Sequence, residues 1–148
     1  MRANRFRGEQ GHSQDELFVR FHTNLLTVIG RSDLDGRLDL LEQAGEITFR
    51  ARQLTAAAIA RIEREFGVRL DESNAAQLVT HLAMALSRLE RGDVETSVPA
   101  VVDDELEAYT RELAFSRSLL DDLGSQLERP VPEAEVAYMT VHLAVLTA

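Results

Sequence analysis

Apolar residues recur at helical spacing along most of the chain, and no stretch combines strict alternation with hairpin turn chemistry. The spacing predicts a helix from a capping box at Ser13–Glu16 to Gly30, and a short one over 34–44 capped by Ser32 or Asp33. Four longer helices are expected over 49–66, from Asp71 or Ser73 to 91, over 103–123 and over 131–148. We therefore expect an all-α fold, a compact bundle of about five main helices.

Glycines mark several of the expected helix ends, since glycine tolerates the left-handed conformation common there. Gly45, Gly67 and Gly92 are placed in this way. The composition of 93–99 indicates a linker, and 124–131 is expected to be a loop. Residues 1–12 are predicted to be a disordered tail, and 13–148 one helical domain, because 148 residues suit a single domain.

The last predicted helix is apolar on two sides. Pro132 suits its first position, since proline lacks an N–H that would be unpaired there anyway. Its two stripes consist of Val136, Met139, Leu143 and Leu146, and of Tyr138, Val141 and Val145. A helix that is apolar on both sides is usually buried on both sides, and that is the expectation for this one.

Two histidines lie at the margins of apolar helix faces. Glu135 precedes His142 by seven residues, or two turns, so Glu135, Tyr138 and His142 share a face. In the same way, Arg88 follows His81 by seven residues on an earlier helix. Glu135 also suits the positive end of its helix, and Arg88 an exposed position beside acidic neighbours, so the pattern alone does not assign them chemistry.

The two segments resemble the PRD family, the regulatory domains through which the bacterial sugar phosphotransferase system controls antiterminators and activators. The resemblance rests on H-L-A-x-A-L-x-R-L-x-R-G at His81–Gly92 and E-x-x-Y-x-T-x-H-L at Glu135–Leu143, in the family's order. It extends from about Ser13 to the C-terminus, with little chain ahead for the RNA-binding or helix-turn-helix module that family members usually carry. Thr80 departs from the family, which often has an acidic residue there.

The resemblance implies a phosphorylation switch with no catalytic turnover and no cofactor. His81 and His142 would accept phosphate from the phosphocarrier protein HPr or from a sugar-permease subunit. Arg88 would face the phosphoryl group and Glu135 would orient the imidazole of His142, with Tyr138 beside it. A homodimer, or contact with another PRD-containing regulator, would then control transcription or antitermination of a sugar-use operon.

Charge and composition argue against several other classes of function. The net charge is −9, which argues against direct binding of nucleic acid. The chain has no cysteine, no signal peptide and no apolar run long enough for a membrane span, so a cytoplasmic location is the simplest expectation. His12 and His22 are interpreted as a tail residue and a residue at the boundary of the first helix.

Two alternatives remain open from the sequence. The chain could be a dimerisation partner or antagonist of a larger regulator that acts without phosphorylation. It could also be a small metal-dependent enzyme using His22, His81, His142 and Glu135. No H-x-x-x-H or H-E-x-x-H pair supports the latter, so no metal site is expected.

Overall fold

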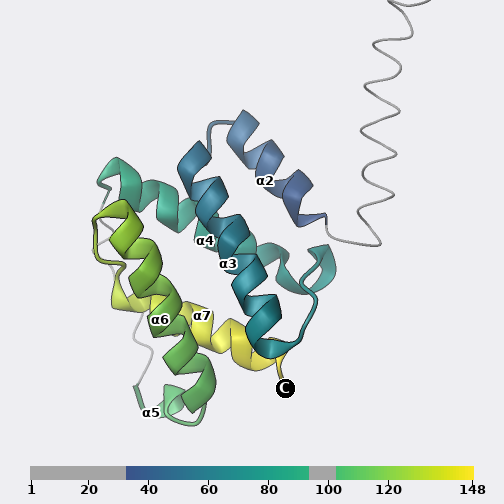
Figure 1. Ribbon diagram of the computed structural model, residues 1–148, viewed down its shortest axis with the longest axis vertical. Coiled ribbons are helices and arrows are strands. Elements are labelled where there is room, and N and C mark those ends of the chain that lie inside the picture. Colours follow the sequence, from purple (N-terminus) through teal and green to yellow (C-terminus); the bar gives the residue numbers. More distant parts are fainter. Residues whose placement is uncertain (1–32, 94–102) are drawn as a thin grey trace, which may run out of the picture.

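The computed structural model describes residues 33–93 and 103–148, which form helices with no strand among them (Figure 1). The tail, the helix expected after Ser13, His12, His22 and nearly all of the linker lie outside these ranges. The helices are α2 (Leu34–Gln43), α3 (Phe49–Phe66), α4 (Glu72–Arg91), α5 (Asp103–Leu106), α6 (Thr110–Leu127) and α7 (Glu133–Leu146). The all-α prediction is confirmed.

The described helices form two packed pairs that meet at α4 and α7. Helix α3 packs on α4, α6 packs on α7, and α2 lies against α4 (Figure 1). Contacts between α4 and α7 connect the pairs. The largest fully buried side chains include Leu78 and Leu86 of α4, Leu119 and Leu120 of α6, and Met139 and Leu143 of α7. None of these helices combines the length and apolar character that crossing a membrane requires.

Helices α3 and α4 follow their predicted limits because strong local signals mark their ends. Of the two candidate caps for α4, Asp71 is the one used: its carboxylate accepts from the backbone of Ser73 and Asn74, and Asn74 completes a capping box. Gly67 and Gly92 end the two helices with φ of 65° and 82°, where a side chain would be strained. These predictions are confirmed.

Helix α2 begins at Leu34 as predicted, but without the expected side-chain cap. Asp33 precedes the first helical residue, but its side chain makes no capping hydrogen bond. Its backbone is already helical, with φ of −81° and ψ of −3°, whereas a capping residue usually has an extended backbone that turns its side chain toward the first free N–H groups. The predicted Asp33 cap is wrong, and Ser32 lies outside the described residues.

The helix expected over 103–123 is interrupted and extends further than predicted. The four-residue α5 ends at Leu106, and α6 begins at Thr110. Leu106 is buried where α5 contacts α7, so the break at 107–109 allows this leucine to join the packing. Helix α6 then continues through Gly124 to Leu127, and the predicted loop over 124–131 is wrong for its first four residues.

Gly124 lies inside α6 because the chain folds back closely over it. The backbone N–H of Arg129 donates to the Gly124 carbonyl at 2.9 Å. A Cβ on Gly124 would lie 2.7 Å from the backbone oxygen of Arg129 and 3.2 Å from a methyl of Val131. Here glycine provides room for the returning chain, which is why a glycine expected to begin a loop stands within a helix.

The substitution Gly124→Ala is expected to destabilise the fold by about 1–3 kcal/mol, because backbone atoms have to move to admit the methyl group. Urea denaturation measures the change. Gly36→Ala is the control, since Gly36 is also helical but nothing lies within 4 Å of the added carbon. That variant should gain about 0.5–1 kcal/mol from helix propensity. Equal effects of the two substitutions would contradict the close approach.

Helix α7 is buried on one side only. Val136, Met139 and Leu143 face the interior, whereas the side chains of Val141 and Val145 are 43% and 73% exposed. Among the described residues, α4 and α6 cover only the inner side, so the expectation of burial on both sides is wrong for the chain as described. Pro132 lies one position earlier than predicted, as the N-cap and not the first helical residue. We call Val141 and Val145 the outward face of α7.

Candidate functional site

Two histidines and a tyrosine form a stack where α4 meets α7. The ring of Tyr138 lies 3.7 Å from that of His81, with an interplanar angle of 15°. On its own helix it lies 4.3 Å from the ring of His142, at 31°. Since two rings cannot occupy one face of the tyrosine at such distances, Tyr138 lies between the imidazoles. The structure thus joins the two sequence motifs at their histidines.

Glu135 is bonded to His81 and not to His142. Its Oε2 lies 2.5 Å from Nε2 of His81, and their side chains are 13% and 32% exposed. The seven-residue spacing correctly placed Glu135, Tyr138 and His142 on one side of α7. It associated the carboxylate with the wrong imidazole, because the partner lies 54 residues away on another helix. An ionised carboxylate only accepts hydrogen bonds, so Nε2 carries the proton in this contact.

The surroundings shift the titration of Tyr138 and His142. Burial lowers the pKa of His142, and the charge of His81 beyond the tyrosine lowers it further. Burial also raises the pKa of Tyr138, and the negative charge of Glu135 adds to this. At neutral pH His142 therefore favours its neutral form, and Tyr138 keeps its proton.

The lowered pKa of His142 predicts a loss of stability on acidification. The folded state disfavours the proton, so below the unfolded pKa of about 6.5 the unfolded state binds more protons. The free energy of unfolding should fall as the pH drops from about 7.5 to about 5.5. Urea denaturation at both pH values should show a smaller fall for His142→Gln than for the wild type. An equal fall in both proteins would contradict a lowered pKa.

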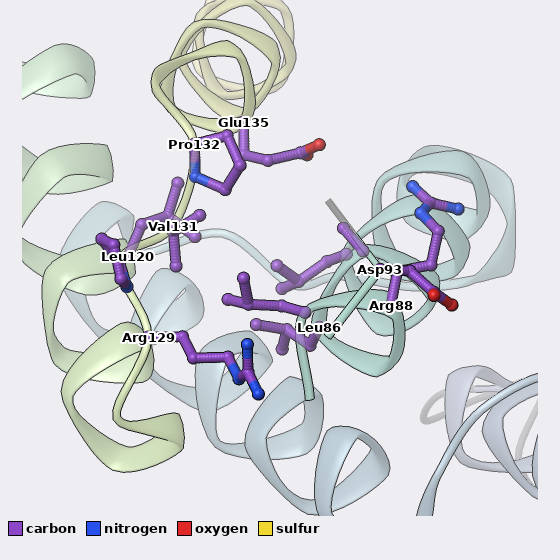
Figure 2. A pocket seen from close by; sticks show the side chains of 12 residues that line it. Leu86, Arg88, Asp93, Leu120, Arg129, Val131, Pro132 and Glu135 are labelled. Carbon is purple, nitrogen blue, oxygen red and sulfur yellow. The ribbon is translucent and has the colours of Figure 1, made fainter. Parts of the chain in front are cut away.

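Arg88 and Glu135 line one pocket of about 200 Å³ between α4 and the segment that joins α6 to α7. Figure 2 shows Arg88 and Asp93 on one side of this pocket, Arg129 on another, and Glu135 above. The rest of the lining is aliphatic and consists of Leu82, Ala85, Leu86, Leu89, Leu120, Val131 and the two prolines. That Arg88 meets a phosphoryl group on His81 stays a prediction.

Arg37 is a neighbour of the site that the sequence did not reveal. From α2 it forms an ion pair with Glu72, and its Nη1 donates to the hydroxyl of Thr80 at 3.2 Å. Thr80 directly precedes His81, so this contact anchors α2 against the turn of α4 that carries the histidine. No periodicity or motif connects residues 37 and 80. In the ranges 33–93 and 103–148, no three histidine, aspartate or glutamate side chains converge as metal ligands would.

Comparison with known proteins identifies one family. A family model described as PRD domain matches residues 56–146, more than half of the 148 residues. The matched part contains both histidines, Arg88, Glu135 and Tyr138. It leaves out α2 and the first turns of α3, although the resemblance had suggested a match from about Ser13. Searches of curated proteins and of solved structures find no match.

Proposed function

Because this chain belongs to the PRD family of regulatory domains of the sugar phosphotransferase system, we propose that it is a module switched by histidine phosphorylation. The phosphoryl group comes from HPr or a sugar-permease subunit and goes to the site formed by His81 and His142. The family is one of regulatory domains and not of enzymes. The module then acts through protein contacts to control transcription of a sugar-use operon.

The observation that carries this proposal is the stack of His81, Tyr138 and His142 with Glu135 beside it. Most buried helix contacts in the chain are aliphatic, whereas this one joins two imidazoles, a phenol and a carboxylate. His81 is partly open to solvent, so a donor protein can reach it. Phosphoryl transfer depends on charge stabilisation and on positioning, and the stacked rings and the bonded carboxylate hold His81 in position. Arg88 supplies positive charge nearby.

We further propose that the module is a homodimer joined through the outward face of α7. Val141 and Val145 are exposed, and they lie on the helix whose Glu135 and Tyr138 contact His81. A phosphohistidine adds roughly two negative charges. Such charge beside an apolar interface favours separation unless arginines meet it. Phosphorylation therefore shifts the balance between monomer and dimer, or between self-association and binding to another PRD-containing regulator.

The test is intact-mass analysis after incubation with phosphoenolpyruvate, enzyme I and HPr, at neutral to mildly alkaline pH. A permease subunit replaces HPr as the direct donor in a second arm. We expect the mass of a phosphoryl group to be added to the wild type and to be lost in a variant lacking the acceptor histidine. The absence of a gain in both arms, with each donor visibly phosphorylated, would favour a dimerisation or antagonist module that acts without phosphorylation.

A further inference from the structure

We propose that the phosphoryl acceptor is Nδ1 of His81, and that Glu135 is the positioning residue that holds the proton on the opposite ring nitrogen. This inference rests on the proposed function, which leaves the acceptor atom and the role of the carboxylate open. Three features of the site carry it: the hydrogen bond from His81 Nε2 to Glu135, the absence of any hydrogen bond to Nδ1 among the described residues, and the contrast with His142.

The bond from Glu135 selects one tautomer of His81. Its Oε2 lies 2.5 Å from Nε2, and an ionised carboxylate has no proton to donate. A neutral imidazole in this contact therefore has its proton on Nε2 and its lone pair on Nδ1. No hydrogen bond within the described part of the chain engages Nδ1. Only the nitrogen with the lone pair can attack phosphorus, so the geometry directs the chemistry to Nδ1.

Tyr138 fixes the plane of the same ring. Its stacked contact with His81, at 3.7 Å and 15°, resists rotation of the imidazole away from Glu135. A half-turn about the Cβ–Cγ bond would put the carbon Cε1 in the place of Nε2, so the bond to Glu135 would be lost and Nδ1 would change sides. The carboxylate and the phenol ring together hold one nitrogen inward and leave the other available. The 32% exposure of the His81 side chain gives the donor access.

The transfer step is balanced without another reactant. The lone pair of Nδ1 forms a bond to phosphorus as the bond between phosphorus and the donor's phosphohistidine nitrogen breaks. The electron pair of that bond returns to the donor ring. The proton of His81 stays on Nε2, so the phosphorylated ring is positively charged while the transfer occurs. Glu135 faces this charge directly, as the carboxylate of a catalytic triad faces its imidazolium.

His142 lacks this arrangement. The ring of His142 donates no hydrogen bond to a carboxylate within the described residues, and Tyr138 lies between it and His81. Burial and the nearby His81 lower the pKa of His142, so its lone pair is less basic. A carboxylate-supported imidazole and an unsupported one are therefore not equivalent acceptors. We assign His142 to the support of the stack and not to the transfer.

Nitrogen NMR of the full chain with labelled histidines tests the inference. In the unphosphorylated protein, long-range proton–nitrogen correlations should show the Nε2–H tautomer for His81. After incubation with phosphoenolpyruvate, enzyme I and HPr, or with a phosphorylated permease subunit, phosphorus–nitrogen coupling should appear at Nδ1 of His81. His81→Ala should lose the signal completely, and His142→Ala should keep it. Single histidine variants assign the rings.

The outcomes separate this inference from the proposed function. Phosphate on Nε2 of His81, or on His142, would overturn the inference and leave the proposed function standing. No phosphate from either donor, with both donors phosphorylated, would overturn both. The tautomer measurement requires no donor: an Nδ1–H tautomer for His81 in the unphosphorylated protein would overturn the positioning role of Glu135 by itself.

Discussion

Glu135→Gln is expected to slow phosphoryl incorporation by about 100-fold or more, a typical loss when a positioned acid–base group is removed. A glutamine at this position can donate its amide N–H to Nε2 of His81. That contact would favour the tautomer with the proton on Nδ1, which removes the lone pair from the proposed acceptor. The site keeps nearly the same shape, while the proton of His81 moves from Nε2 to Nδ1. Time courses of intact mass at saturating phosphorylated donor measure the rate.

Glu133→Gln is the matched control for this substitution. Glu133 and Glu135 both lie in the first turn of α7, so each substitution removes similar favourable charge from the helix N-terminus, worth about 0.3–1 kcal/mol. Glu133 points outward to Arg117, at 2.5 Å, and its side chain is 64% exposed. The Glu133→Gln variant should therefore incorporate the phosphoryl group at the wild-type rate. Equal slowing in both variants would assign the effect to the helix charge and remove the role of the bond to His81.

The two relations of Glu135, to its own helix and to His81, illustrate which features of the site follow from sequence. Spacing along one helix is a local property, so the shared side of Glu135, Tyr138 and His142 could be predicted. The pairing of Glu135 with His81 depends on how α4 crosses α7, which no pattern within either helix fixes. Arg37 is a stronger example, since it comes from a separate helix and reaches Thr80 through tertiary packing alone.

The fold shows a similar division between local and tertiary causes. The ends of α3 and α4 were predictable because a cap or a glycine acts on its neighbours in the chain. Gly67 ends its helix, whereas Gly124 lies inside one. The difference is tertiary, because the returning segment at Arg129 occupies the space that a side chain on Gly124 would fill. The break before α6 likewise accompanies the burial of Leu106 near α7.

Leu143→Ala is expected to cost about 2–5 kcal/mol, the largest loss of stability among these substitutions. Leu143 is 0% exposed and belongs to the core on the inner side of α7. Removing most of its side chain forfeits burial and leaves a cavity that rigid neighbouring helices fill only in part. Urea denaturation of the whole chain measures the change. Leu143→Met nearly conserves the side-chain volume and should cost less than about 1.5 kcal/mol. If the alanine variant is largely unfolded, the stability of this methionine variant can still be compared with that of the wild type.

Val145→Ala on the same helix distinguishes the fold of one chain from the proposed association of two. Its side chain is 73% exposed, so in a monomer the substitution should change stability by less than about 0.5 kcal/mol. In a dimer joined through the outward face of α7, the valine is buried, and stability depends on protein concentration. The cost of Val145→Ala should then exceed about 1 kcal/mol at high concentration and shrink on dilution. Leu143→Ala should remain costly in both regimes, because its side chain is buried within a single chain. A small cost for Val145→Ala at every concentration would contradict the dimer and leave the inner packing of α7 unaffected.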